Sequence, residues 1–490
     1  MITLHEKAAQ FIAQTPHLHW WNGKPQAGTT SQTSEVFNPA DGSRLTQVAL
    51  GGAKEVDEAV QSAHRAFGEW SKLSPQERST LMHRFADLME EEKEILAQIE
   101  SLDVGKAITA TRGFDIPFGV ECIRYFANLS VQTPRDTPLS IANMEARIHR
   151  SPYGVCGFIF PWNFPYNLLL WGIIPALAAG NTVVVKPSEV TPLSTLYVAQ
   201  LAIRAGIPAG VFNVVLGDGP SVGVPLTEHP LVKRMSFTGS GRAGADVARR
   251  CGQRIIPCKL ELGGKGAAVL FEDTDLEKAV TQLAGAITFN TGQVCCTATR
   301  WFVHEKIYEE FSRRIVEVLQ KVKIGSSLDE ATEMGPLASA AHKERVLGYL
   351  DQGIQQGAKV VLDADRKKGS AGYFVSPFLL EGSDENICFR EEIFGPTAFM
   401  VRFKEENEAI TRVNSIPYGL ANSVWSQDLV RANRVAEQLA AGNNWINAHN
   451  VFAYGLPYGG IHQSGFGGGV NSPETLNDYL LPKTIARPLD

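Results

Sequence analysis

From Tyr153 onward the sequence alternates short apolar runs with segments of helical spacing, and no other feature constrains the fold as strongly. Between Tyr153 and Lys265 the apolar runs are VCGFIF, NTVVVK, VFNVVLG and RMSFT, and a helical segment follows each of them. Strand–helix units of this length predict a parallel sheet with helices on both faces. After Lys265 the alternation begins again with AAVLF. We therefore expect an α/β chain with two doubly wound parallel-sheet domains.

The region before Tyr153 has a different, mainly helical pattern. Apolar residues recur at spacings of three and four over residues 55–100, which predicts helices. Ser74-Pro75 separates two of them, and the second is expected to end at Gly105. A further helix followed by extended chain is expected over residues 110–150.

Composition excludes several classes of function. The 490 residues are 44% hydrophobic and 20% charged, as in ordinary globular proteins, and the net charge of −6 argues against nucleic-acid binding. The sequence contains no apolar run long enough to span a membrane, and its N-terminus lacks a secretory signal. Its seven scattered cysteines show neither a disulfide framework nor zinc-ligand spacing. We expect a cytoplasmic protein with reduced thiols, no metal and no membrane or nucleic-acid partner.

Two short segments contain groups suited to covalent catalysis. FNTGQVCCTATR, residues 289–300, holds the adjacent thiols Cys295 and Cys296, and LELGGK, residues 260–265, holds Glu261. A thiolate is a strong nucleophile, and a carboxylate at the end of an apolar run can act as a general base. These segments predict a nucleophile and its base.

Both segments resemble the aldehyde dehydrogenase superfamily, whose hallmarks are a Glu inside LELGGK and a Cys two residues after the Gln of G-Q-x-C. This rule selects Cys295 over Cys296, and the resemblance extends from about Trp21 to the C-terminus. It implies that Cys295 adds to an aldehyde and that Glu261 activates water to hydrolyse the resulting thioester. Relatives that transfer the acyl group to coenzyme A typically lack this Glu. Asn163, in PWNFP, matches the family residue that donates to the oxyanion.

The resemblance also implies a division of the chain and an assembly. Residues 1–129 and 152–260 would bind NAD, and residues 261–465 would form the catalytic domain. Residues 130–151 and 466–490 would form a small β arm and tail that join subunits into a homodimer or homotetramer.

The cofactor site could be assigned in two ways. Gly239–Gly244 satisfies GxGxxG, which would make Glu261 the acid that binds the ribose. This strand–helix unit comes late in the sheet, however, and Glu261 belongs to LELGGK. We therefore assign the ribose to Lys186 and Glu189 of KPSE, and since Glu189 would repel a 2′-phosphate we expect NAD in preference to NADP. The full set of expected cofactor neighbours is Ile159, Phe160, Trp162, Lys186, Ser188, Glu189, Gly219, Gly239, Ser240, Leu262, Glu392 and Phe394.

The expected substrate tunnel is aromatic and largely uncharged. Its residues, by match to family positions, are Phe164, Leu168, Trp171, Phe289, Asn450, Phe452 and Tyr458. Such a wall suits an apolar or aromatic aldehyde. It also resembles the aromatic box of betaine- and amino-aldehyde dehydrogenases, which often add two acids from an earlier helix. Here Asp115 falls at one of these acid positions and Phe118 at the other.

Alternatives remain for individual residues and for the whole chain. The Cys-Cys pair could be buried packing, Asn163 a turn residue, Lys186 with Glu189 a surface ion pair, and Glu392 a cap. The protein could also be a catalytically silent family member. We expect structural or peripheral roles for His304, His449 and His462.

The C-terminal region departs from the family pattern. After Pro457-Tyr458-Gly459-Gly460 the family usually continues with Lys and then S-G-x-G-R-E. This chain has His462 and SGFGGGVNSPETLNDYL, and so lacks that Lys, Arg and Glu. We expect the difference to affect assembly or the rim of the pocket.

Overall fold

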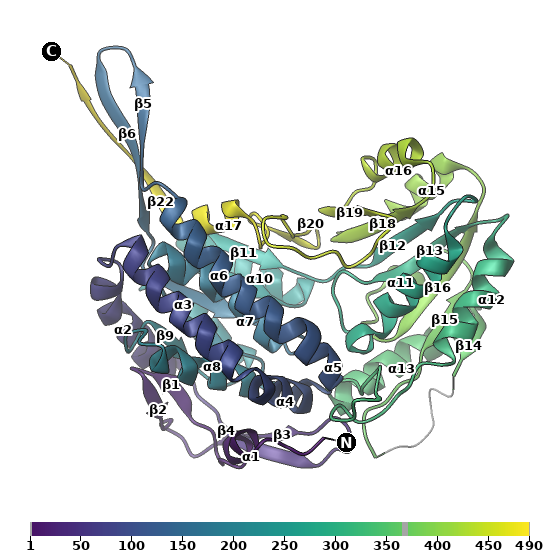
Figure 1. Ribbon diagram of the computed structural model, residues 1–490, viewed down its shortest axis with the longest axis horizontal. Helices are drawn as coiled ribbons and strands as arrows, with labels where there is room; N and C mark the ends of the chain where they lie inside the picture. The colour runs from purple at the N-terminus through teal and green to yellow at the C-terminus, as the bar shows by residue number, and fades with distance from the viewer. Residues whose placement is uncertain (1, 365–370, 490) are drawn as a thin grey trace.

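The strand–helix units after Tyr153 supply the five central strands of an eight-stranded sheet in the computed structural model, which describes residues 2–364 and 371–489 (Figure 1). Its order is β2-β1-β9-β8-β7-β10-β11-β21, and the five central strands are parallel. In that order the strands are Lys24–Gln26, His19–Trp21, Phe212–Val214, Thr182–Lys186, Val155–Ile159, Val232–Thr238, Cys258–Glu261 and Gly465–Phe466. The chain runs outward from β7 in both directions, so β7 and β10 form a switch point, where nucleotides commonly bind.

Helices cover both faces of this sheet, as predicted. One face packs against α2 (Ala53–Trp70), α9 (Val224–Glu228) and α10 (Gly241–Arg254). The other face packs against α7 (Pro165–Ala179) and α8 (Leu193–Arg204). A second helical layer lies outside these two and consists of α1 (Glu6–Ile12), α3 (Pro75–Glu91), α4 (Lys93–Val104) and α6 (Ile116–Gln132).

The second expected α/β unit is also present. Its seven-stranded sheet has the order β14-β15-β16-β13-β12-β18-β19, with only β14 antiparallel. In that order the strands are Lys359–Asp363, Phe378–Glu381, Thr397–Phe403, Ala298–His304, Gly266–Leu270, Ala421–Trp425 and Asn443–Ile446. One face packs against α11 (Leu276–Thr288) and α12 (Tyr308–Leu319), and the other against α13 (Ala340–Gln355), α14 (Ile387–Arg390), α15 (Glu406–Val413) and α16 (Leu429–Ala436). The predicted fold class is therefore confirmed.

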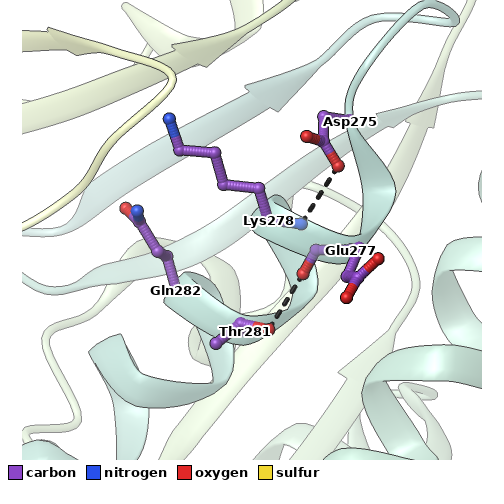
Figure 2. A pocket seen from close by; sticks show the side chains of 5 residues that line it. All are labelled: Asp275, Glu277, Lys278, Thr281 and Gln282. Carbon is purple, nitrogen blue, oxygen red and sulfur yellow. Dashed lines mark hydrogen bonds between the residues drawn. The ribbon is translucent and has the colours of Figure 1, made fainter.

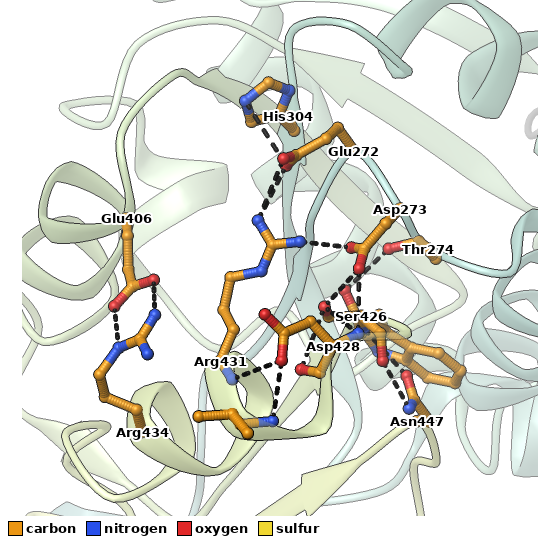
Figure 3. Close-up of polar contacts among 12 residues, drawn as sticks. Glu272, Asp273, Thr274, His304, Glu406, Ser426, Asp428, Arg431, Arg434 and Asn447 are labelled. Carbon is orange, nitrogen blue, oxygen red and sulfur yellow. Dashed lines mark hydrogen bonds and ion pairs between the residues drawn. The ribbon is translucent and has the colours of Figure 1, made fainter.

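A charged cluster fixes α16 to the end of β12 (Figure 3). The Arg431 guanidinium lies 3.1 Å from Glu272 Oε1 and 2.8 Å from Asp273 Oδ1. Asp428 caps the helix by accepting from Val430 N and Arg431 N. Because Arg431 binds both of these carboxylates, the cluster ties α16 to the segment that follows β12.

A three-stranded β arm projects from the body of the molecule (Figure 1). Strand β6 (Met144–Pro152) pairs antiparallel with β5 (Asp136–Ile141) on one side and with the C-terminal β22 (Leu480–Pro488) on the other. Two smaller pairs complete the strands, β3 (Thr33–Phe37) with β4 (Arg44–Ala49) and β17 (Tyr418–Gly419) with β20 (Ile461–His462).

One helix prediction was wrong. The segment expected to be one helix from Pro75 to Gly105 is split into α3 and α4 at Glu92, whose backbone leaves helical geometry at φ −99° and ψ 22°. The buried Glu92 carboxylate binds Lys7, Arg204 and the Tyr197 hydroxyl, so partners distant in sequence hold the break. The helix does end at Gly105, which has φ 88°.

All seven cysteines are free thiols. Within residues 2–364 and 371–489, no cluster of metal-ligating side chains occurs and no helix is long and apolar enough to cross a membrane.

Candidate active site

The expected nucleophile lies in a tightly anchored loop between α11 and β13. The chain leaves α11 through a turn in which Asn290, Thr291 and Gly292 have φ of 47°, 57° and 70°. The buried Gln293 side chain then accepts from Ala338 N at 2.9 Å and donates to Asn290 O at 2.9 Å. These bonds fix the approach to Cys295.

Of the two adjacent thiols, Cys295 is the more acidic. Contact with the Cys296 thiol and then the Tyr458 hydroxyl, 3.2 Å from Cys295 Sγ, lowers the pKa of Cys295 despite burial. Burial raises the pKa of Cys296 well above its usual range, and its thiol donates to Asn450 Oδ1 at 3.3 Å. This difference supports Cys295 as the nucleophile.

Glu261 lines the same cavity as Cys295. It is the last residue of β11, and the cavity wall also includes Leu168, Trp171 and Tyr458. Burial raises the Glu261 pKa to about 8, and the nearby Lys259 charge opposes this rise. One Glu261 carboxylate oxygen is buried without a hydrogen-bond partner in the protein. A buried carboxylate of this kind is suited to accepting a proton.

Asn163 contacts the loop that carries the nucleophile. Its side-chain amide donates to Gln293 O at 3.0 Å, and its backbone carbonyl accepts from the Asn290 amide at 2.8 Å. Because a carboxamide has two N–H groups, the second one can serve an oxyanion formed near Cys295.

Lys186 and Glu189 lie at the carboxyl end of the central strand β8. The Lys186 ammonium donates to Pro187 O at 2.7 Å and to Gly217 O at 2.9 Å, and it lies 3.3 Å from Glu189 Oε2. The ion pair between Lys186 and Glu189, named above as an alternative, is therefore present. The Glu189 side chain is nevertheless 43% exposed. It lies at the carboxyl edge of the sheet, where a ribose would bind.

Other expected cofactor residues border the same edge. Ile159 is the last residue of β7, and Phe160 and Trp162 follow it. Ser188 is largely buried and lies two residues after Lys186. A Cβ on Gly223 would lie 3.4 Å from Ile159 Cδ1 and 3.6 Å from Lys186 Cδ, so the glycine leaves room beside these two side chains. A Cβ on Gly219 or Gly241 would meet nothing within 4 Å, so the main chain is open to a pyrophosphate at both. Ser240 caps α10, and helix N-termini favour phosphate. These residues fit a dinucleotide.

The remaining cofactor candidates lie around LELGGK. Glu392 accepts from Gly264 N at 2.9 Å, and burial raises its pKa to about 7. Phe394 packs edge-on against Trp162 with ring centroids 5.5 Å apart. Close packing fixes the positions of Leu262 and Gly239. A Cβ on Gly244 would lie 2.5 Å from the Leu262 side chain, and a Cβ on Gly239 would lie 2.7 Å from the Phe237 ring.

The expected substrate residues are brought together. Trp171 packs against Tyr458 and Phe452 with centroids 5.7 and 6.1 Å apart, and Phe164 packs against Phe289 at 5.8 Å. Leu168 borders the cavity of Cys295, while Asn450, Phe289 and Phe452 line an outer pocket. Trp171 and Tyr458 line the cavity of Cys295, and Phe289 and Phe452 line the outer pocket, so this aromatic group contributes to both.

A second depression, which shares Gln282 with the outer pocket, is lined by neither a thiol nor an aromatic ring (Figure 2). It lies over the first turns of α11, and Asp275, Glu277, Lys278, Thr281 and Gln282 line it. Asp275 accepts from Lys278 N at 3.2 Å and Thr281 donates to Glu277 O at 2.9 Å, so its polar groups serve the helix. Gln282 belongs to both pockets.

A model of the aldehyde dehydrogenase family matches residues 26–485. The chain belongs to the aldehyde dehydrogenase family.

Relatives of this family align with most of the chain. The 2-aminomuconic semialdehyde dehydrogenase of Mus musculus is 40% identical over 441 residues, 88% of this chain and 91% of the relative. The cytosolic 10-formyltetrahydrofolate dehydrogenase of Xenopus tropicalis is 37% identical over 96% of this chain. This chain spans about half the length, 53%, of that relative. The NAD+ complex of an aldehyde dehydrogenase from Bacillus cereus has a TM-score of 0.97 at 37% identity, with 100% of both chains covered.

The structure adds aromatic residues that sequence reasoning missed. Phe114 packs edge-on against Phe289 at 5.6 Å, and the Tyr454 hydroxyl accepts from Trp171 Nε1 at 3.2 Å and donates to Phe118 O at 2.8 Å. Phe114 lies just before α6 and Phe118 lies within it. Their spacing of four residues would have indicated from the sequence that both rings lie on one helix face.

Asp115 does not reach the aromatic wall as a free acid. Its buried carboxylate lies 2.9 Å from Lys106 Nζ and accepts from the Asn167 amide at 2.7 Å. Lys106 in turn lies 3.8 Å from the centroid of the Phe164 ring. The protein's own ammonium group therefore occupies one face of Phe164.

His449 supports the cysteine loop from behind. Its Nε2 lies 2.9 Å from Cys296 O and its Nδ1 lies 3.0 Å from Ser423 Oγ. Burial lowers the His449 pKa to about 4, so the ring is neutral near pH 7. A neutral ring that donates to a carbonyl is consistent with the structural role expected for His449.

Proposed function

We propose that this protein oxidises an aldehyde to the free carboxylic acid with NAD, using Cys295 as nucleophile and Glu261 as base. The observation that carries the proposal is the shared cavity of the Cys295 thiol and the Glu261 carboxylate. A CoA-acylating or silent relative would have no need for that carboxylate.

The first steps belong to Cys295 and Asn163. The Cys295 sulfur bonds to the carbonyl carbon, and the carbonyl oxygen becomes an oxyanion. The Asn163 amide and the backbone N–H of Cys295 donate to that oxyanion, and each such donor contributes roughly 3–4 kcal/mol in comparable sites. Bound NAD would supply the hydride acceptor, and Lys186, Glu189 and Glu392 would hold it.

Glu261 acts in the hydrolytic step. A thioester on Cys295 remains, and Glu261 takes a proton from water while the water oxygen bonds to the acyl carbon. The C–S bond then breaks with its electron pair on sulfur, the acid leaves, and the proton held by Glu261 is released as Cys295 returns to the thiolate that began the cycle. Because the pKa of Glu261 is about 8, the base is mainly protonated at pH 7, so hydrolysis should accelerate as the pH rises through about 8.

Lys186 and Glu189 would bind the ribose of the cofactor. This arrangement favours NAD over NADP, because the 2′-phosphate of NADP would bring a second negative charge beside the Glu189 carboxylate. Glu392 would hold the nicotinamide ribose, with Phe394 beside the ring. We also propose that residues 1–129 and 152–260 form the NAD-binding domain and residues 261–465 the catalytic domain. Residues 130–151 and 466–490 would form the arm and tail that join subunits.

The substrate class follows from the aromatic wall. We propose an apolar or aromatic aldehyde, since the expected lining contains no arginine or lysine and Lys106 already covers one face of Phe164. The second candidate is a betaine or amino aldehyde, because Trp171, Phe452 and Tyr458 still pack together and rings attract cations. The burial and pairing of Asp115 disfavour this candidate.

The test is NADH formation by the purified protein with a long-chain aliphatic aldehyde, an aromatic aldehyde, an aminoaldehyde and betaine aldehyde. We expect the two neutral substrates to have the higher kcat/KM. Cys295→Ala should abolish turnover, whereas Cys388→Ala, which removes a buried thiol from α14, should not. A preference for the cationic pair would favour the second candidate, and turnover by Cys295→Ala would contradict the mechanism.

We further propose a cytoplasmic homodimer or homotetramer joined through β5, β6 and β22. One edge of this arm, β22, pairs with β6 on one side only. Sedimentation showing a monomer would contradict the assembly.

A further inference from the structure

The glycine-rich segment that departs from the family pattern lies directly against the strand of the proposed base. Gly465 and Phe466 form β21, which pairs antiparallel with β11 so that Gly465 lies opposite Glu261. Gly467, Gly468 and Gly469 follow with φ of 101°, 98° and 65°. A Cβ on Gly467 would lie 2.9 Å from Cys258 O, so a residue with a side chain could not lie this close to β11.

This close approach brings two groups of the tail to Lys259. Asp478, just after α17 (Pro473–Asn477), places Oδ2 2.7 Å from Lys259 Nζ. Lys259 also donates to Gly469 O. A Cβ on Gly468 would lie 2.8 Å from the Asp478 carboxylate, so this glycine too is needed for the contact.

Lys259 and Glu261 point to the same face of β11, because they are two residues apart in a strand. The Lys259 side chain is 1% exposed and that of Asp478 is 26% exposed. A row of ionisable groups therefore leads from the buried base, through the buried ammonium, to a carboxylate that reaches solvent.

Few other ionisable groups face this row in the described residues. Cys295 and Tyr458 face Glu261 across the cavity. Arg234 of β10 and Lys259 both approach the Tyr479 ring, with the Arg234 guanidinium 4.9 Å and the Lys259 ammonium 5.9 Å from its centroid. Lys259 is the cation that acts directly on Glu261.

We propose that Lys259 and Asp478 form a positioning pair that sets the pH range in which Glu261 can act as a base. The pair does not touch the substrate; it acts through the charge of Glu261. This inference rests on the role of Glu261 proposed above.

The direction of the effect follows from the charges. The Lys259 ammonium stabilises ionised Glu261, and so it limits the rise in pKa that burial causes. Asp478 partly cancels the ammonium charge, and burial lowers the pKa of Lys259 while Asp478 opposes that change. A nearby opposite charge shifts a carboxyl pKa by roughly 1–3 units.

The test separates acylation from hydrolysis with 4-nitrophenyl acetate. The burst of 4-nitrophenolate reports acylation of Cys295, and the steady rate that follows reports hydrolysis of the acyl enzyme. We expect Lys259→Met to keep the burst but to move the midpoint of the hydrolysis–pH profile upward by about one unit, which means about tenfold slower hydrolysis at pH 7. Asp478→Asn should move the midpoint downward. Lys233→Met, on neighbouring β10 and exposed, is the matched control and should leave it unchanged.

The outcomes separate this inference from the proposed function. If Glu261→Gln keeps full hydrolysis, the role of Glu261 fails. If Glu261→Gln loses hydrolysis but the folded Lys259→Met and Asp478→Asn variants keep the wild-type midpoint, only the positioning pair is refuted. If Lys259→Met does not fold, Asp478→Asn tests the same coupling by infrared titration. The carboxyl band of Glu261 is identified by its loss in Glu261→Gln, and its midpoint is then compared between the wild type and Asp478→Asn.

Discussion

Replacing Glu189 with Gln should relax the preference for NAD over NADP. The 2′-phosphate of NADP would bring negative charge beside the Glu189 carboxylate at the end of β8. Two unit charges about 4 Å apart repel by about 1 kcal/mol in water and about 4 kcal/mol at an effective dielectric constant of 20. Glu189 is 43% exposed and Lys186 Nζ lies 3.3 Å away, so the lower part of this range applies. We expect about 1.5–2 kcal/mol, a roughly 10–30-fold change in the NAD/NADP ratio of kcat/KM.

The assay is initial-rate kinetics with each cofactor at a saturating aldehyde concentration. Glu277→Gln, an exposed carboxylate at the start of α11, is the matched control and should leave the ratio unchanged. A ratio that stays within twofold of the wild type in Glu189→Gln would refute the assignment of Glu189 to the ribose.

Three further substitutions test other contacts of the site. Asn163→Ala should lower kcat by about 100–1000-fold through loss of an oxyanion donor; a loss below tenfold in single-turnover measurements would contradict that role. Tyr458→Phe removes a hydroxyl that lowers the pKa of Cys295, so the pH midpoint of alkylation by iodoacetamide should rise, and an unchanged midpoint would contradict the contact. Lys106→Met leaves the buried Asp115 carboxylate without its cation, which costs about 3–5 kcal/mol and should lower Tm by several degrees in calorimetry. An unchanged Tm would show that Asp115 is neutral in the folded protein.

The sequence predicts those parts of the fold that depend on local pattern. Strand and helix periods after Tyr153 predict the parallel strands of both sheets, and Gly105, with φ of 88°, ends its helix as expected. The break at Glu92 was missed because Lys7, Arg204 and Tyr197, all distant in sequence, hold it.

The site shows the same division. Cys295 and Glu261 lie inside motifs of distinctive spacing, so the sequence nominates both, and the structure places them in one cavity. The pairing of Asp115 with Lys106 could not, because it depends on how the segment before α6 turns inward. Lys259 stands two residues before Glu261 in the sequence, but its ion pair with Asp478 could not be predicted, because it forms only when the tail folds back onto β11.

The most direct test of the account is the mass of the Glu261→Gln protein after one turnover with NAD and an aromatic aldehyde. If Glu261 acts only in hydrolysis, NADH should form in a single burst and the acyl group should remain on the peptide that contains Cys295. Continued steady turnover with no acyl group on Cys295 would contradict the role of Glu261 as the base, and an acyl group on a different residue would contradict Cys295 as the nucleophile.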